Sequence, residues 1–197
     1  MKKLFIIIII FITFQSWSKA NDIRDFEIEG VSVGDSLLDF LDKWDLTEQS
    51  IIDYPKNTYP GSKKFHGLRI NQKSGEYDHF SALLKKGDKK YIIYILRGVR
   101  HFENNLSGCK KYKKKVVESF KELLSNVDPI DYIHKYRGDE ESISYITAFN
   151  FKDGSTVRAY CDTWSASTKK EKRWDDALNI ELSSAEGLDW INNEAYN

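Results

Sequence analysis

The architecture of this chain can be worked out from the segment Tyr91-Ile92-Ile93-Tyr94-Ile95-Leu96-Arg97-Gly98-Val99-Arg100-His101-Phe102. Its first six residues are apolar or aromatic at odd and even positions alike, whereas a strand with one solvent-exposed face alternates between apolar and polar residues. The stretch therefore predicts an interior strand that is covered on both faces.

The residues before this segment predict two further strands, Phe65–Ile70 and Tyr77–Leu84. Turn residues at Lys73-Ser74-Gly75 and Lys86-Gly87-Asp88 connect the three strands into a meander. After the meander, apolar residues at helical spacing predict a helix from about Gly108 to Ser125, before the break at Asp128-Pro129.

The last third of the chain predicts a hairpin and one more strand. Ile143–Phe151 and Thr156–Cys161 flank the turn sequence Lys152-Asp153-Gly154-Ser155. Ala177–Ser183 alternates apolar residues with Asn179, Glu181 and Ser183, which predicts a strand with one face in solvent. Ser183-Ser184-Ala185-Glu186 then predicts the capped start of a short closing helix.

The N-terminal part predicts a strand at Phe26–Glu29 and a turn at Gly30–Gly34. A helix follows through Trp44, with Asp35 or Ser36 as its cap. The element order β-α-β-β-β-α-β-β-β-α predicts an α+β fold in which helices pack on an antiparallel sheet built from hairpins. We expect residues 21–197 to form a single α+β domain.

Residues 1–20 have the three-part pattern of a secretory signal peptide. Lys2 and Lys3 precede the apolar run Leu4–Phe14, and Ser18-Lys19-Ala20 supplies small residues for cleavage. The run is short for a membrane span, although an uncleaved anchor is the alternative. We therefore expect a protein that is periplasmic or secreted, with no transmembrane segment once the signal is removed.

The charge of the sequence argues against one class of partner, and its cysteine count predicts a covalent cross-link. The chain has 30 basic and 30 acidic residues, and loss of three lysines with the signal leaves a net charge of −3, which argues against a nucleic-acid partner. Two cysteines in an exported chain, Cys109 and Cys161, predict one disulfide. A redox or nucleophilic cysteine is the alternative, without support from a Cys-x-x-Cys motif.

The run Ile28-Glu29-Gly30-Val31-Ser32-Val33-Gly34-Asp35-Ser36-Leu37-Leu38-Asp39 resembles the opening of an uncharacterised family of small exported proteins from AT-rich marine bacteria. The strand Lys89–Tyr94, a lysine-rich helix opening with Cys109 and a second Cys before Trp164 are similar to later parts of that family. The resemblance covers most of the mature chain. It implies export and a disulfide, and no assigned activity.

Gly34-Asp35-Ser36-Leu37 also resembles the first block of the GDSL hydrolases. That resemblance implies an exported serine esterase with Ser36 as nucleophile and Asp131 and His134 as its acid and base. Such a site needs a base within reach of the hydroxyl and donors for the oxyanion. A helix-capping Ser36 is the alternative, and it requires no enzyme.

The sequence indicates no cofactor and no metal site. Its histidines are far apart, and His66 and His79 are the one pair close enough to be candidates for a meeting across the first hairpin. The alternative for both is an exposed or hydrogen-bonded histidine within a strand. The run Lys110–Lys115 predicts either a contact with an anionic surface or a solvated helix face.

A polar loop between Trp164 and Trp174 is the best candidate for a ligand-binding surface, together with Lys169 and Lys170. The two indoles are predicted either to stack on a ligand or to contact each other at the base of the loop. We therefore expect an exported, disulfide-stabilised, non-enzymatic binding or envelope-associated module. Its candidate partners are an envelope protein, a glycan or an anionic lipid surface.

Overall fold

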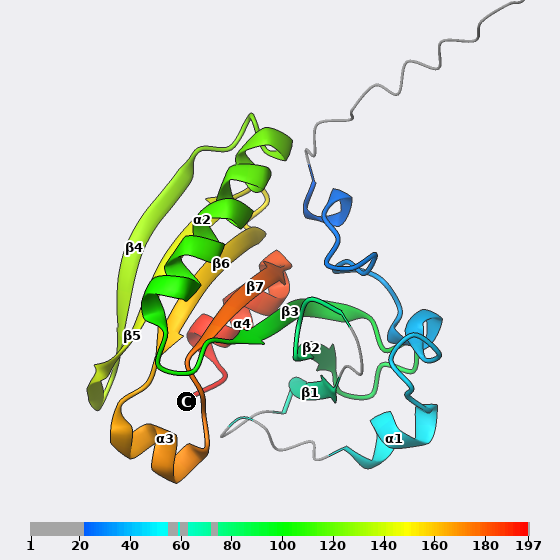
Figure 1. The fold of residues 1–197 in the computed structure, drawn as a ribbon. Helices are drawn as coiled ribbons and strands as arrows, with labels where there is room; N and C mark the ends of the chain where they lie inside the picture. Colours follow the sequence, from blue (N-terminus) through cyan, green and yellow to red (C-terminus); the bar gives the residue numbers. More distant parts are fainter. Residues whose placement is uncertain (1–21, 55–58, 60–62, 72–74, 197) are drawn as a thin grey trace, which may run out of the picture.

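A computed structural model describes residues 22–54, 59, 63–71 and 75–196 (Figure 1). The predicted signal peptide and most of the predicted turn at residues 73–75 lie outside this range. Within the described residues, none of the helices combines the length and apolar character needed to cross a membrane.

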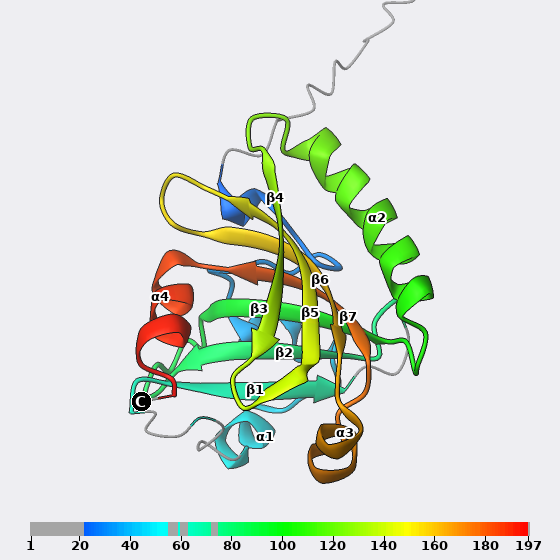
Figure 2. The ribbon, with the colours of Figure 1, turned by 90° about the vertical axis from the view of Figure 1, so that its left-hand side faces the viewer.

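The described residues form a seven-stranded antiparallel sheet in the order β1-β2-β3-β7-β6-β5-β4, which confirms the α+β fold class (Figures 1 and 2). The strands are β1 (Phe65–Asn71), β2 (His79–Lys85), β3 (Ile93–His101), β4 (Pro129–Tyr136), β5 (Asp139–Asn150), β6 (Thr156–Thr163) and β7 (Ala177–Ser183). The helices are α1 (Glu48–Asp53), α2 (Leu106–Leu123), α3 (Ala166–Lys172) and α4 (Ala185–Asn193), with short 3₁₀ turns η1 (Ile23–Asp25) and η2 (Leu37–Phe40). In Figure 2, β1–β3 cross β4 and β5 at a steep angle, as expected of a strongly twisted sheet.

The prediction of an interior strand is confirmed, because β3 lies between β2 and β7. Ile93 and Leu96 belong to the main apolar core, while Ile95 belongs to a second core with Trp190 of α4. The main core lies between the sheet, α2 and residues 23–54, and we call this side of the sheet the apolar face. The opposite side is the polar face, and α4 covers one end of it.

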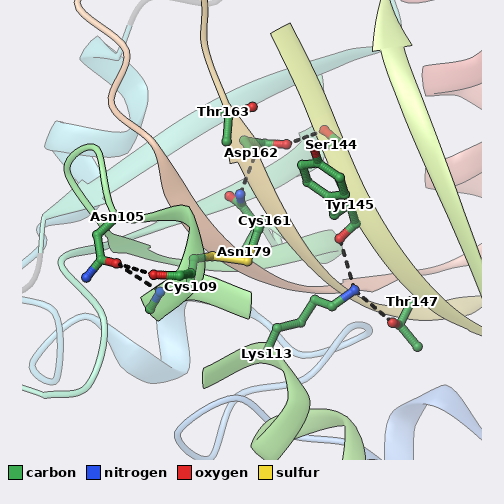
Figure 3. Close-up of a disulfide and its surroundings, with 12 residues drawn as sticks. Asn105, Cys109, Lys113, Ser144, Tyr145, Thr147, Cys161, Asp162, Thr163 and Asn179 are labelled. Atoms are coloured by element: carbon green, nitrogen blue, oxygen red, sulfur yellow. Dashed lines mark hydrogen bonds between the residues drawn. A yellow bond between two sulfur atoms is a disulfide. The ribbon is translucent and has the colours of Figure 1, made fainter. Parts of the chain in front are cut away.

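A disulfide joins α2 to the sheet, as predicted. Cys109, in the first turn of α2, is bonded to Cys161 of β6 across 52 residues, with 6.1 Å between the Cα atoms (Figure 3). Asn105 caps α2, since its side chain accepts a hydrogen bond from the Gly108 N–H. The helix therefore begins two residues before the predicted start and is fixed to the apolar face at that end.

The predicted strand at Phe26–Glu29 is wrong. Glu29 and Gly30 both have positive φ angles and turn the chain at once, which leaves a single bridge between Ile28 and Val31. The predicted helix through Trp44 shortens to η2, with Ser36 as its cap. Trp44 is nevertheless buried. The apolar pattern therefore predicted the burial of this side chain correctly and the length of the helix wrongly.

Three elements were not predicted, namely α1, β4 and α3. The strand β4 begins at Pro129, directly after the predicted break, and proline is tolerated at the first residue of an edge strand. Helix α3 occupies the predicted loop between Trp164 and Trp174. Ser165 caps its start, and Arg173, in a left-handed conformation, ends it.

Candidate functional site

The prediction that one face of β7 is exposed to solvent is wrong. Asn179, Glu181 and Ser183 were predicted to face solvent, yet they are 4%, 0% and 0% exposed. Asn179 and Glu181 have hydrogen-bond partners on the neighbouring strand β6, and the Ser183 hydroxyl donates to Glu181 on the same strand. Burial therefore leaves none of the three without a hydrogen bond. The buried polar residues of β7 are therefore the centre of the candidate site.

The strand register places Arg97 of β3 and Arg158 of β6 directly on either side of Glu181. Arg97 donates from Nε at 2.8 Å and from Nη2 at 2.6 Å to Glu181 Oε2. Arg158 donates to Oε1 from Nε at 3.1 Å and also from Nη2. Tyr160 and Ser183 add hydroxyl donors at 3.0 and 2.8 Å. We call these five residues the arginine–glutamate cluster.

The cluster carries an excess positive charge. Burial opposes ionisation of Glu181, but Arg158 and Arg97 hold its pKa well below the usual range. Two guanidinium groups thus share one carboxylate, which leaves a net charge of +1. The side chains of Arg97 and Arg158 are 36% and 20% exposed, and their Nη1 edges lie outside the contacts with Glu181. The carboxylate therefore fixes both guanidinium groups in place while part of each reaches the surface.

A second buried carboxylate, Asp162, lies further along β6. It accepts hydrogen bonds from the Ser144 hydroxyl and from Asn179 Nδ2 at 2.9 Å (Figure 3). The Tyr136 hydroxyl donates a third hydrogen bond at 3.3 Å. Burial raises the pKa of Asp162 to about 6. The hydrogen bonds of this carboxyl group connect four adjacent strands, β4 to β7. Its charge changes with pH around a value of about 6.

Four aromatic rings form a continuous series at the same end of the polar face. The ring centroids of His134 and Tyr136 are 5.1 Å apart, those of Tyr136 and Trp164 are 4.7 Å apart, and those of Trp164 and Trp174 are 4.6 Å apart. We call this series the aromatic ladder. Trp174, at its end, is 48% exposed. A large apolar surface is thus held in place by its neighbours and left open to solvent.

The two predicted lysines of this region differ in environment. Lys169 donates to Asp176 at 2.8 Å and to Asn104 at 3.0 Å, so its ammonium group is already used within the fold. Lys170 is exposed on α3. Trp164 and Trp174 contact each other at the base of α3. Of the two arrangements predicted for these indoles, this is the mutual contact. Their role in binding stays a prediction.

The three candidate residues of the GDSL alternative do not come together. Ser36 donates to the Lys90 carbonyl at 2.7 Å and accepts from the Leu38 N–H, as a capping residue does. It lies next to the start of β3, whereas Asp131 and His134 lie on β4, four strand spacings or about 19 Å away along the sheet. Asp131 and His134 also point to opposite faces, since they pair with Thr147 and Ser144 of β5.

The candidate pair His66 and His79 does not meet. His66 pairs with Leu84 and His79 with Asn71, so the two lie on opposite faces and five positions apart along β1. His79 instead contacts His101 of β3, with 5.5 Å between ring centroids. Among the described residues, no group of three or more His, Cys, Asp or Glu side chains is arranged to hold a metal ion.

The lysine run on α2 divides into two sets. Lys113 donates to the Tyr145 carbonyl at 3.1 Å and to the Thr147 hydroxyl at 3.0 Å, and Lys110 lies 3.4 Å from the centre of the Tyr145 ring (Figure 3). Burial lowers the pKa of Lys113. Lys111, Lys114 and Lys115 are exposed. The predicted charged patch is therefore smaller than the sequence run.

Sequence reasoning missed the arginine–glutamate cluster. The available signal was the position of Arg97, Arg158 and Glu181 within strands, each flanked by apolar residues that alternate with it. Charged residues of opposite sign within apolar strands often pair across a sheet. Comparison of this chain with protein-family models, with curated proteins and with solved structures finds no match.

Proposed function

We propose that this chain is an exported, non-catalytic binding protein whose ligand contacts the aromatic ladder on the polar face. Export is supported by the signal-like pattern of residues 1–20 and by a disulfide between Cys109 and Cys161, a bond that persists in oxidising compartments. The structure carries no support for the esterase alternative, because Ser36 caps a helical turn far from Asp131 and His134 along the sheet.

The exposed indole of Trp174 is the observation that carries the binding proposal. The ring of Trp174 is not an isolated exposed side chain, because it packs against Trp164, which packs against Tyr136. Contiguous exposed aromatic surface beside polar residues is typical of interaction sites. Restraint by neighbouring rings reduces the entropy that a binding surface loses on contact with its ligand. The ladder is thus a preorganised aromatic surface.

A glycan is the ligand class that this surface fits best. A sugar ring presents an apolar face that stacks on an indole and hydroxyl groups that need polar partners beside it. His134 and Lys170 are exposed polar side chains at either end of the ladder region. Further along the same face, the arginine–glutamate cluster offers donors to an acidic substituent.

Intrinsic tryptophan fluorescence tests the proposal directly. Trp44 and Trp190 are 3% and 1% exposed and give a constant background, so quenching by a ligand reports on Trp164 and Trp174. The mature protein is titrated with peptidoglycan fragments, a neutral glucan oligomer and an oligouronate. We expect saturable quenching by at least one of them, with affinity reduced about tenfold in Trp174→Ala, the loss of one stacking contact.

Tyr196→Ala is the matched control, since Tyr196 is an aromatic residue that is 70% exposed and lies outside both the ladder and β4. This variant should bind like the wild type. An equal loss of affinity in Tyr196→Ala and Trp174→Ala would remove the ladder as the site. A lack of quenching by every glycan tested would overturn the assignment of the ligand class.

A further inference from the structure

Strand β4 presents an unusual edge. It forms one end of the sheet and pairs with β5 on its inner side. None of its eight residues is buried, and three large apolar side chains on it are exposed, Ile130 by 52%, Tyr132 by 41% and Ile133 by 62%. The opposite edge strand, β1, buries Phe65, His66, Leu68 and Ile70. The two edges of one sheet therefore have different surfaces.

The free edge of such a strand can form backbone hydrogen bonds with a strand of another chain. Its outward N–H and C=O groups are unpaired within the sheet, and proteins usually protect such edges with short strands, bulges or a covering segment. The pairing of β4 with β5 is regular from Pro129 to Lys135 and becomes irregular between Lys135 and Tyr136. The regular part extends for about 24 Å. It is thus long enough to form a ladder with another extended chain.

The sequence of β4 is self-complementary about Ile133. In an antiparallel pairing of two β4 strands centred on this residue, Ile133 lies opposite Ile133 of the second copy. Asp131 then lies opposite Lys135 of the second copy, and Tyr132 lies opposite its His134. Paired residues share a face, so the ion pairs and the Ile–Ile contact form on the apolar side of the strand and the aromatic pairs form on the other.

Neighbouring registers lose this match. A shift of two residues in one direction places Asp131 opposite Ile133, and the same shift in the other direction places Ile133 opposite Lys135. Both arrangements leave a charge facing an apolar side chain. The register about Ile133 is therefore the one in which apolar and charged positions both agree.

We propose that two copies of this chain associate through β4, antiparallel and centred on Ile133, so that their sheets join into one continuous sheet. The two-fold axis of such a pairing is perpendicular to the sheet, because equivalent residues lie on the same side of it. The polar faces of both copies then lie on one side of the assembly. Two aromatic ladders would be presented together to a repeating ligand or surface.

A charge-exchange experiment tests this assembly. The mature protein and two variants, Lys135→Glu and Asp131→Lys, are examined by sedimentation velocity over a range of concentrations. Each variant alone places like charges opposite each other at two positions, so its self-association should weaken by about tenfold or more. In a mixture of the two variants, every opposed pair is again of opposite sign, and a mixed dimer should form with affinity close to that of the wild type.

Lys89→Glu provides the control, because it makes the same charge change at an exposed lysine in the turn between β2 and β3. Thermal melting verifies that each variant is folded, which matters for Asp131→Lys since Asp131 accepts a hydrogen bond from Thr147. A monomeric wild type at all concentrations would overturn the proposal. Equal weakening by Lys89→Glu, or a mixture that stays monomeric, would also overturn it.

Discussion

On the apolar face β7 presents Leu178, Ile180 and Leu182, and on the polar face it presents Asn179, Glu181 and Ser183. All six are between 0% and 4% exposed. The first three are buried against α2 and the N-terminal segment, where removal of apolar surface from water is the favourable term. The second three are buried because hydrogen-bond partners replace water.

Equal burial on one strand thus has two physical origins, and the two faces should tolerate substitutions differently. An apolar contact loses stability in proportion to the surface and volume removed. A buried charge with its partners contributes little net stability while it is intact, yet loss of one partner is severe, because the remaining charges stay where water cannot reach them fully. Substitutions can separate these two behaviours.

The largest effect should follow from Glu181→Ala. This change leaves Arg97 and Arg158 adjacent without their common carboxylate, and we expect the free energy of unfolding to fall by about 3–5 kcal/mol. Denaturant unfolding at pH 7 measures the loss. Glu186→Ala is the control, since Glu186 is 41% exposed and forms surface ion pairs with Lys64 and Lys85, so it should cost less than about 1 kcal/mol. Similar losses in both variants would contradict the central role of Glu181.

On the apolar face, the disulfide should give the next largest effect. Replacing both Cys109 and Cys161 with serine frees a loop of 52 residues in the unfolded chain, worth about 4 kcal/mol in the chain-entropy model. Denaturant unfolding of the double variant without reductant measures this loss. Reductant should destabilise the wild type and leave the double variant unchanged. Equal stability of the two proteins would show that the bond does not constrain α2.

Asp162 should produce a pH dependence of opposite sign to that of Glu181. Its pKa is about 6 in the folded protein and 3.8 as the ordinary value, so the folded state binds the proton more tightly. Its contribution to stability therefore falls by up to about 3 kcal/mol as the pH rises from about 4 to 6, and is constant above that. Glu181, whose pKa is lowered, instead loses its contribution as the solution becomes strongly acidic.

The substitution Asp162→Asn removes this titrating carboxyl group and keeps all other titratable side chains. The difference in the free energy of unfolding between wild type and variant therefore reports on Asp162. Unfolding is measured between pH 4 and pH 8. The wild type should lose stability relative to the variant as the pH rises from about 4 to 6, and the difference should stay constant at higher pH. Parallel stability profiles for the two proteins would show that Asp162 does not titrate with a raised pKa.

The smallest effect should come from Ser36→Ala, in the segment that covers the apolar face. Loss of the cap and of the hydrogen bond to the Lys90 carbonyl should cost about 1 kcal/mol. Intact mass after treatment with a fluorophosphonate is measured on the same samples. We expect no adduct on either protein. An adduct on the wild type that disappears in Ser36→Ala would instead support the esterase alternative.

Parts of the fold could be predicted because their signals are local. The interior strand β3, the hairpin of β5 and β6 and the helix α2 each follow from residue patterns within about twenty positions. Strand β4 lacks such a signal, since an exposed edge does not need alternating apolar residues. The helix α3 was missed for a related reason, because it buries no residue and lies within a polar segment.

The candidate site could be predicted only in part. Trp164 and Trp174 were identified because large aromatic residues in a polar segment are visible in the sequence. Tyr136 and His134, which complete the ladder, come from β4 and could not be placed beside them without knowing that strand. The two arginine partners of Glu181 lie 84 and 23 residues away in the chain.

Elements whose residues are neighbours along the chain follow from local sequence patterns, and the disulfide follows because two cysteines allow a single pairing within the chain. The position of β7 between β3 and β6 is a property of the folded chain that no local pattern contains. That placement turned a face with the pattern of a solvated strand into a buried ion-pair cluster. The physical reason is register: which side chain meets which across a sheet depends on the pairing of distant strands, and a local pattern does not contain it.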